Sequence, residues 1–426
     1  MSLIDEKWEI LFEKYQIEQE IQKNGRFYIT ADQIREVKEP RLMTKFDTRE
    51  SLPGVFGRKI AILPVTRGTY VLGEFDLYQD FPEMVSDIRQ ITGADIPDYY
   101  ETIDIHDIRS EASAINIMSI AGILEDFLGE KHMVQTVSGR MGSGSFGFYV
   151  DGFPGTGKKE AKSYITVENS QIEIDGGFEN QNVFSVMEGK NVVHSNFLIR
   201  QLYYPTRVWS EKIQKPIRPV FMVYSNNIFR LLEYEFTDKK DYSSIRLVQE
   251  RNYSLEDIAI TMEELCAVWK KTAVQPEPKV AFIQADSFYK VISLTEHLNE
   301  NPMTTAEIAI VFGFKERQSD YYFNACRYLG LAEKLTDEEG IKVHITKSGR
   351  KLLKMRYKER QLEYVKLMLE HQIFHELFEI VLRTGGVPEK RMIAGKMREL
   401  QVCSENLIDR RASSVRGWLQ WILERV

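Results

Sequence analysis

The sequence has few cysteines and no long apolar run. Its 426 residues include three cysteines, Cys266, Cys326 and Cys403, whose wide spacing predicts neither a disulfide framework nor a paired metal-ligand motif. It contains no stretch of about 18 apolar residues and no leader with a basic start and an apolar centre, so we expect neither a membrane span nor secretion. These absences favour a cytoplasmic globular protein, and the length predicts about two to four domains.

Basic charge is scarce in the chain as a whole but concentrated near its C-terminus. The formal net charge is −7. Residues 341–426 hold 18 Lys and Arg against 10 Asp and Glu, a net charge of +8, whereas the rest of the chain carries −15. This asymmetry predicts that an anionic partner such as nucleic acid binds near the C-terminus.

Residues 172–190, IEIDGGFENQNVFSVMEGK, contain the acidic groups that are central to our interpretation. Two apolar runs with a period of two predict strands joined by a Gly-rich turn. Asp175 ends the first run, and in the second Glu188 and Lys190 leave the same face because they are two residues apart. Pairing of the strands would bring Asp175 and Glu188 together at one rim, with an ammonium group beside them.

This combination of groups predicts phosphodiester hydrolysis. Divalent cations such as Mg²⁺ prefer carboxylate oxygens, and a bound metal activates water and shields the leaving oxygen. A neighbouring lysine orients the water and neutralises charge in the transition state. The alternative is a solvated hairpin, because Asp…Glu-x-Lys patterns occur by chance in many charged proteins.

A Gly-rich segment at 152–158, GFPGTGK, is close to a phosphate-binding P-loop. A P-loop requires Ser or Thr after the lysine, but Lys159 stands there, and the following residues are strand-like rather than helical. A nucleoside triphosphatase is therefore an alternative, and we favour a Gly-rich hairpin.

The region before the hairpin predicts mixed α and β structure. An amphipathic helix is expected over residues 1–23, a short helix from Ala31 capped by Thr30, and strands at 58–65 and 68–75. Another helix follows Ser110. Arg41 and Lys45 lie in a polar connection, EPRLMTKFD, where they contact either DNA or only solvent. After the hairpin we expect a helix from Ser195 to Tyr203 and then two strands, VFMVYS and IFRLLEYEF.

The segments IDGGFEN, VFSVMEGK and IRQLYYPTRVW together resemble a group of type II restriction endonucleases of the PD-(D/E)XK nuclease superfamily. The spacing Asp-x(12)-Glu-x-Lys is that of the superfamily motif, with Ile174 in place of the usual proline. The resemblance also extends to EPRLMTKFD and the C-terminal tail. It implies a nuclease core with a mixed sheet flanked by helices, and Mg²⁺-dependent, sequence-specific cleavage of double-stranded DNA to leave 5′-phosphate ends.

The resemblance also implies roles for individual residues. Asp175, Glu188 and the Gly189 carbonyl would bind the metal, and Lys190 would position the attacking water. Two further candidates lie on flanking helices: Gln201, next to Arg200, after the Glu-x-Lys strand, and Glu111 before the hairpin. The family further implies pairing with a DNA methyltransferase in a restriction-modification system, and cutting of both strands favours a homodimer.

The segment 276–357 predicts a winged helix-turn-helix. An amphipathic helix, FYKVISLTEHLNE, precedes a second helix capped at Thr304 or Thr305, a turn at Gly313 and a third helix, and two short strands follow. The third helix would read bases through residues near its start. These are Arg317, Gln318, Ser319 and Tyr322. The alternative is a winged helix that binds protein or merely packs.

The C-terminal segment, 358–426, is predicted to be helical and basic. Arg410, Arg411 and Arg416 precede an apolar stretch and suit phosphate contacts, although a solvated basic face is the alternative.

We therefore predict an α/β (α+β) protein of four parts. These are an N-terminal α+β region (1–100), a nuclease core (101–275), a winged helix-turn-helix (276–357) and a basic helical region (358–426). The predicted function is that of a type II site-specific deoxyribonuclease, and the alternative is a non-catalytic winged-helix DNA-binding regulator.

Overall fold

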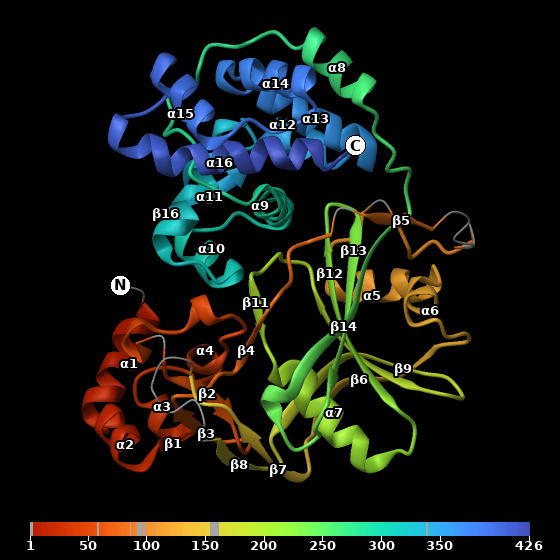
Figure 1. Ribbon diagram of the computed structural model, residues 1–426. Coiled ribbons are helices and arrows are strands. Elements are labelled where there is room, and N and C mark those ends of the chain that lie inside the picture. The colour runs from red at the N-terminus through yellow and green to blue at the C-terminus, as the bar shows by residue number, and fades with distance from the viewer. Residues whose placement is uncertain are drawn as a thin grey trace.

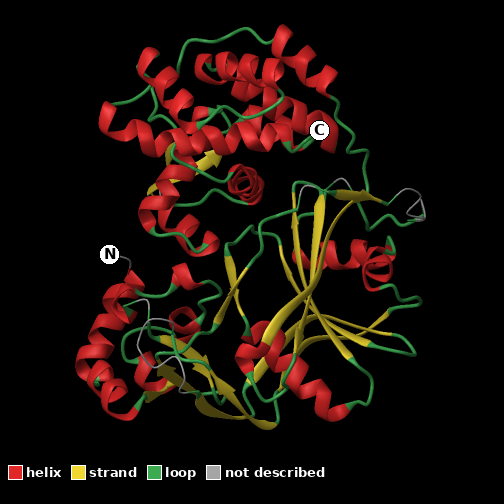
Figure 2. Cartoon of the chain, in the orientation of Figure 1, coloured by secondary structure: helices red, strands yellow, loops and turns green. Residues whose placement is uncertain are grey.

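A seven-stranded mixed sheet forms the middle of the protein in the computed structural model, which describes residues 3–57, 59–85, 87–91, 96, 99–105, 107–153, 162–337 and 340–426. The strand order across the sheet is β5 (Ile88–Gln90), β14 (Ile245–Ser254), β13 (Ile228–Phe236), β12 (Ile217–Ser225), β10 (Phe184–Lys190), β9 (Gln171–Glu179), β6 (Val134–Gly142). β10 is antiparallel to β9 but parallel to β12, and the helix α7 (Arg200–Lys212) makes the crossover that a parallel pair requires. The chain is thus α+β, as predicted (Figure 2).

Helices cover both faces of this sheet (Figure 1). On one face α5 (Glu111–Ile120) and α6 (Ile123–Leu128) pack on a core that includes Met187 and Met222. On the other face Leu202 of α7 packs against Phe221 and Val223 of β12. The single helix expected after Ser110 is divided in two at Gly122, whose φ of 69° ends α5.

The central hairpin differs from the prediction in the position of its turn. β9 continues through Gly176 and Gly177 to Glu179, and the turn is formed by residues 180–183, where the Asn180 side chain accepts from the amides of Asn182 and Val183. The two glycines belong to the strand, where Gly176 pairs with Met187 and Gly177 with Val186. Neither position has room for a side chain, because a Cβ atom at Gly176 would approach the Phe178 ring to 2.6 Å and one at Gly177 would approach Val137 to 2.9 Å. Asp175 is therefore inside β9 and not at its end.

The segment after β10 is also different from the prediction. β11 (Asn196–Leu198) pairs with β4 (Tyr78–Asp80), so α7 begins at Arg200, and the prediction of a helix from Ser195 was wrong. The backbone of residues 196–198 is held in the strand by hydrogen bonds to a distant part of the chain, which local sequence does not reveal. The two strands predicted after the helix are confirmed as β12 and β13.

The N-terminal segment forms a small unit of its own, whose core includes Trp8, Phe12 and Phe56. The amphipathic helix is split into α1 (Leu3–Lys14) and α2 (Ile17–Asn24) at Gln16, which has a φ of 49°. A three-stranded sheet, β1 (Arg26–Thr30), β3 (Thr69–Gly73) and β2 (Ala61–Pro64), contains the two predicted strands. Between β1 and β2 lie α3 (Ala31–Arg35), with the expected cap at Thr30, α4 (Pro40–Thr44) and the turns η1 (Arg49–Ser51) and η2 (Gly54–Phe56). β7 (Ser145–Val150) and β8 (Ser163–Glu168) form a separate ribbon.

The C-terminal part is a mostly helical unit with one continuous core. Three helices and a β-hairpin occur in the predicted order: α9 (Phe288–Glu300), α10 (Thr305–Phe312), α11 (Glu316–Tyr328), β15 (Ala332–Asp337), β16 (Gly340–Ile345). The other helices are α8 (Met262–Lys271), α12 (Lys347–Leu353), α13 (Tyr357–Leu369), α14 (Gln372–Thr384), α15 (Lys390–Glu399), α16 (Glu405–Leu423). The ring centroid of Phe288 in α9 lies 4.9 Å from that of Trp418 and 4.4 Å from that of Trp421 in α16. The two regions that we predicted on either side of residue 357 therefore share one core.

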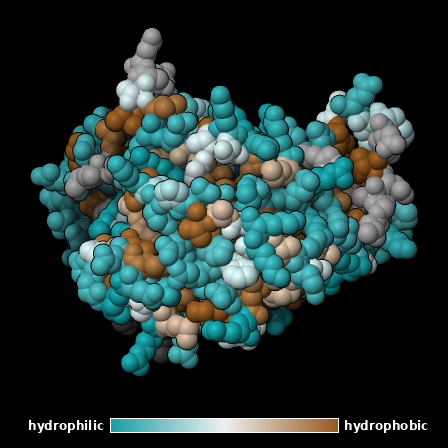
Figure 3. Space-filling model, turned by 90° about the horizontal axis from the view of Figure 1, so that it is seen from above, coloured by the Kyte–Doolittle hydropathy of each residue, from teal (hydrophilic) through white to brown (hydrophobic). Residues whose placement is uncertain are grey.

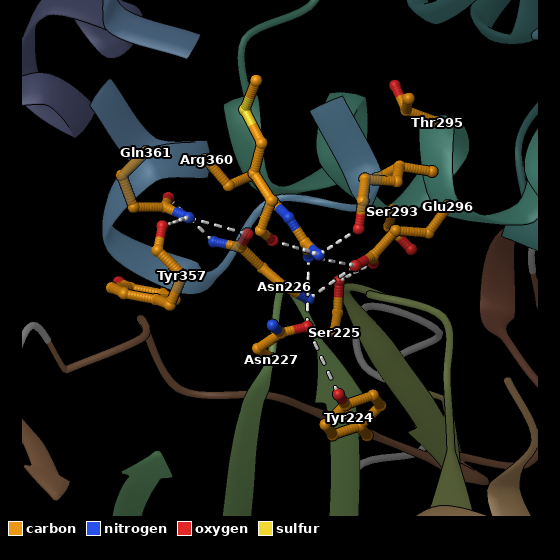
Figure 4. A network of polar contacts seen from close by, with 12 residues as sticks. Tyr224, Ser225, Asn226, Asn227, Ser293, Thr295, Glu296, Tyr357, Arg360 and Gln361 are labelled. Carbon is orange, nitrogen blue, oxygen red and sulfur yellow. Dashed lines mark hydrogen bonds and ion pairs between the residues drawn. The ribbon is translucent and has the colours of Figure 1, made fainter. Parts of the chain in front are cut away.

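The C-terminal unit lies on one end of the sheet, where the β12–β13 turn enters it (Figure 4). Asn226 and Gln361 exchange two side-chain hydrogen bonds of 2.9 Å, and the amide of Asn226 donates to Glu296 over 2.9 Å. Arg360 donates to Asn227 over 3.1 Å. Each of these polar groups is buried or partly buried with its partner, so the junction is a specific interface.

The top of the molecule, formed by this unit, is largely hydrophilic, with apolar side chains in separate patches (Figure 3). No helix in the described part of the chain combines the length and the apolar character needed to cross a membrane.

Candidate active site

The structure brings Asp175 and Glu188 to neighbouring strands at the point where the ladder between them ends. The antiparallel ladder between β9 and β10 ends with the pair Gly176 and Met187, and Asp175 and Glu188 are the next residues of the two strands. There the Oδ2 atom of Asp175 accepts a hydrogen bond from the Gly189 amide over 2.9 Å. A side chain thus replaces a backbone partner in the ladder, and the acids lie where the strands separate.

Glu188 is the centre of a hydrogen-bonded group. Its side chain is buried, and its Oε1 atom accepts from Lys190 Nζ over 2.5 Å and from Gln201 Nε2 over 2.6 Å. Gln201 lies in the first turn of α7, so the start of this helix is joined directly to β10. Gly189 faces the opposite side of the sheet, where an added Cβ would lie 3.0 Å from Ile115 Cδ1.

The electrostatics of this group follow from its burial. The pKa of Glu188 is raised to about 8, mainly by burial and also by the nearby Asp175 carboxylate, against the opposing effect of Lys190. Burial alone would lower the pKa of Lys190, but the carboxylates of Glu188, Glu111 and Asp47 outweigh it and raise that pKa. Lys190 is therefore a stable ammonium group surrounded by acids.

Glu111, a predicted candidate, is also near these groups. It is the first residue of α5, where the Ser110 hydroxyl caps the helix by accepting from the Ser113 amide. Burial raises the pKa of Glu111, while the charge of Lys190 lowers it and that of Asp175 raises it. The structure thus places Glu111, Asp175, Glu188, Lys190 and Gln201 around one point of the sheet.

Sequence reasoning missed Asp47, which comes from the N-terminal unit. Its backbone carbonyl accepts from the Leu198 amide over 3.0 Å, so the segment is held just before α7. The charge of its carboxylate raises the pKa of both Glu188 and Lys190. Asp47 lies in the stretch EPRLMTKFD, which carried part of the family resemblance, and this was the one available signal. Lys45 Nζ is 3.8 Å from Asp47 Oδ2 and is largely exposed.

The site offers oxygen donors but no dense metal cluster. Within the described ranges, no group of three or more His, Cys, Asp or Glu side chains is arranged to hold a metal ion. The donors that are present are the carboxylates of Asp175 and Glu188 and the Oε1 atom of Gln201, which is buried without a hydrogen-bond partner among the described residues. Such oxygen atoms suit Mg²⁺, and the unpartnered amide oxygen is compatible with an additional cation. These residues fit the predicted metal, with Glu188 shared between it and Lys190.

The predicted base-reading residues of α11 separate into two classes. Arg317 and Gln318 are exposed. Ser319 is fully buried, and Tyr322 is buried with its hydroxyl donating to Asp286 Oδ1 over 2.9 Å. The prediction of DNA contacts by Ser319 and Tyr322 was wrong, because these positions are on the face of α11 that packs into the core. The accessible face contains Arg317, Tyr321, Asn324 and Arg327 at helical spacing.

The predicted arginines of the C-terminal helix also differ in their surroundings. Arg410 is exposed, and its guanidinium lies 5.8 Å from the centroid of the Tyr321 ring, which Arg317 also approaches to 5.6 Å. Arg416 is exposed as well. Arg411 is half-buried and donates to the carbonyl of Phe282 over 2.7 Å, so its role in this structure is to connect α16 to the chain before α9. In the N-terminal unit, Arg41 is exposed on α4.

The P-loop-like segment is described only at its start. Gly152 forms an isolated β-bridge with Phe75, and residues 154–161, which include Lys158 and Lys159, lie outside the described residues.

Three families match successive parts of the chain. Each is a domain of unknown function: DUF6996 over residues 5–72, DUF6997 over 73–254 and DUF7226 over 290–426. The DUF6997 match includes Glu111, Asp175, Glu188, Lys190 and Gln201, whereas Asp47 belongs to the DUF6996 match and α11 to the DUF7226 match. No curated protein and no solved structure matches the chain.

Proposed function

We propose that this protein is a magnesium-dependent, sequence-specific endonuclease that cleaves double-stranded DNA and leaves 5′-phosphate ends. The observation that carries the proposal is the convergence of Asp175, Glu188, Lys190 and Gln201 where β9 and β10 separate. Carboxylates beside a buried ammonium group are the chemical groups that metal-assisted phosphodiester hydrolysis requires.

The arrangement of elements supports the same proposal. A mixed sheet with α5 on one face and α7 on the other agrees with the resemblance to the PD-(D/E)XK nucleases of the type II restriction enzymes. The acids of the motif pattern occupy neighbouring strands, and the helices before and after them supply Glu111 and Gln201. The resemblance further leads us to propose a cytoplasmic homodimer that acts alongside a DNA methyltransferase.

Each residue of the group has a distinct task in this proposal. Asp175, Glu188 and the Gly189 carbonyl would hold Mg²⁺, which supplies an activated water and charge neutralisation when bound. Lys190 remains an ammonium group because of the surrounding acids, so it orients the attacking water and offsets negative charge on the phosphate. Gln201 holds the Glu188 carboxylate in place through its amide.

The C-terminal unit would bind the DNA. Its three helices and β-hairpin have the order of a winged helix-turn-helix, and the excess of positive charge lies in residues 341–426 of the same unit. Arg317 and Arg410, which both stack on Tyr321, would contribute cations to one binding face. We retain Gln318, Arg416, Arg41 and Lys45 as further proposed DNA contacts, since all four are exposed.

One observation favours a second candidate function, a DNA-binding regulator without catalysis. The 2.5 Å contact between Lys190 and Glu188 already neutralises the acid that would bind the metal. In that case the C-terminal unit would bind DNA through the accessible face of α11, and the ion pair between Lys190 and Glu188 would have a structural role only.

Digestion of a supercoiled plasmid of known sequence separates the two functions. The endonuclease produces linear fragments in Mg²⁺ and none in EDTA, and mapping of the ends reveals one sequence and a 5′-phosphate. The regulator binds the same plasmid in a salt-dependent manner but leaves it supercoiled.

A further inference from the structure

The turn between α10 and α11 is packed against the N-terminal segment that carries Asp47. Gly313, in this turn, has a φ of 61°, and a Cβ atom added to it would lie 2.0 Å from Thr48 Oγ1 and 3.0 Å from Thr48 Cβ. Thr48 directly follows Asp47 and is 3% exposed. The backbone of the turn therefore lies directly against the residue next to Asp47, at a distance that admits glycine alone.

The same C-terminal unit contacts the segment that follows Lys190. The carbonyl of Phe312, the last residue of α10, is 3.3 Å from His194 Nδ1. From α9, Lys290 Nζ donates to Ser195 Oγ over 2.8 Å, and Ser293 Oγ accepts from the Val193 amide over 3.4 Å. Both chain segments that border the candidate site are thus in contact with the helix-turn-helix.

These two segments are also bonded to each other. The side-chain oxygen of Asn196 accepts from the Arg49 amide over 2.8 Å, and its amide donates to both oxygens of Glu50. Asn196 is buried, so these bonds are shielded from water. A displacement of Thr48 would be transmitted to Asp47 on one side and to the start of α7, with Gln201, on the other.

We propose that the α10–α11 turn is a positioning element of the candidate site: by packing Gly313 on Thr48, it holds the segment of Asp47 against β11, next to the start of α7. The C-terminal unit then sets the geometry of the cleavage site in addition to binding DNA. This inference rests on the proposed nuclease function for its catalytic consequence, but the packing that it describes is measurable without any activity.

The chain offers a matched set of variants for the test. Gly313→Ala introduces a Cβ that collides with Thr48, and it also adds backbone strain because φ is positive. Gly330→Ala is the control, since Gly330 in the same unit has a φ of 69° and no atom within 4 Å of an added Cβ. Thr48→Ala removes the colliding hydroxyl, which has no hydrogen-bond partner among the described residues.

The first measurement is hydrogen exchange of the Leu198 amide, which donates to the Asp47 carbonyl. Gly313→Ala should accelerate it, and Gly330→Ala should leave it unchanged. Addition of Thr48→Ala to Gly313→Ala removes the contact with Oγ1 but keeps the one with the Cβ atom, so it should restore slow exchange in part. Wild-type exchange at Leu198 in Gly313→Ala would overturn the proposal even if the protein proved to have no nuclease activity.

The second measurement is the cleavage rate. Misplacement by about 1 Å can cost roughly a hundredfold in rate, so we expect Gly313→Ala to lower kcat by about that factor with KM for DNA unchanged. The double variant should recover part of the lost kcat, and Gly330→Ala should cleave as the wild type does. Asp47→Asn leaves the packing of Gly313 on Thr48 intact and should lower kcat by about 10–100-fold. This variant tests the role of Asp47 if Gly313→Ala does not fold. Unchanged kcat in Asp47→Asn, in an enzyme that cleaves, would refute the positioning role.

Discussion

The side-chain amide of Gln201 lies 2.6 Å from the Oε1 atom of Glu188, which joins the first turn of α7 to β10. Lys190 donates to the same oxygen, so one carboxylate atom receives two donors from different elements. The position of Glu188 therefore depends on where α7 begins, and α7 begins at Arg200 because β11 occupies the preceding residues.

Substitution of Gln201 should weaken cleavage without unfolding the protein. We expect Gln201→Ala to reduce the cleavage rate by about 10–100-fold at low Mg²⁺, because the carboxylate of Glu188 loses an orienting donor. Rates measured over a range of Mg²⁺ concentrations check this, with Glu211→Gln on the exposed end of the same helix as the control. A Gln201→Ala rate curve that coincides with that of the wild type would remove Gln201 from the site.

The pH dependence of stability should reveal the half-buried His194 at the contact with Phe312. Burial lowers the pKa of His194 from 6.5 to about 4, so between these values the unfolded chain binds a proton that the folded chain does not. This histidine's contribution to stability is present above pH 6.5 and is lost as the pH falls toward 4, by about 3 kcal/mol in all.

His194→Asn keeps an amide donor near the Phe312 carbonyl but removes the titration. Urea unfolding at several pH values should show a smaller loss of stability between pH 6.5 and 4 in this variant than in the wild type. His132→Asn is the matched control, because His132 is exposed and its φ of 58° suits asparagine. The same pH slope in the wild type and in His194→Asn would show that His194 titrates normally.

DNA binding should depend on the accessible face of α11 and not on its buried face. Arg317→Ala and Arg410→Ala should each lower the salt slope of binding by about 0.9. Tyr322→Phe should leave the slope unchanged, although it loses the hydrogen bond to Asp286 and about 1 kcal/mol of stability. Fluorescence anisotropy with a labelled duplex at several salt concentrations measures these slopes. An effect of Tyr322→Phe on the slope equal to that of Arg317→Ala would contradict the burial of Tyr322.

Local patterns were sufficient for the hairpin but not for its partners. Alternation of apolar residues predicted that Glu188 and Lys190 share a face and that Asp175 is on the neighbouring strand. The glycines at 176 and 177 predict a turn from local sequence alone, but they fit a strand because the Phe178 ring packs on Gly176 and Val137 of β6 packs on Gly177. Asp47 was missed for the same reason, since hydrogen bonds to β11 bring it to the site from another unit.

The helices α9 to α11 show a different limit of sequence reasoning. Capping at Thr304 and the turn at Gly313 predicted the helices accurately. Which face of α11 is buried depends on how α9 and the preceding segment pack against it, as the bond between Tyr322 and Asp286 shows. The start of a helix therefore indicated its position but not its orientation about its own axis.

We propose that Asp175 and Glu188 hold the metal ion that cleaves DNA, and two conservative variants test this role most directly. Purified wild-type protein, Asp175→Asn, Glu188→Gln and the control Glu173→Gln are incubated with plasmid in Mg²⁺. Glu173 lies on the same strand as Asp175, and its side chain is 57% exposed and pairs with Arg140. Folding is checked by circular dichroism and DNA binding by anisotropy.

We predict that the wild type and Glu173→Gln cleave the plasmid. Asp175→Asn and Glu188→Gln should bind DNA but cleave it at least about a thousandfold more slowly, which corresponds to a loss of about 4 kcal/mol in transition-state stabilisation. Cleavage by either of these two variants at the wild-type rate, or folded wild-type protein that binds DNA and leaves it intact in Mg²⁺, would contradict it.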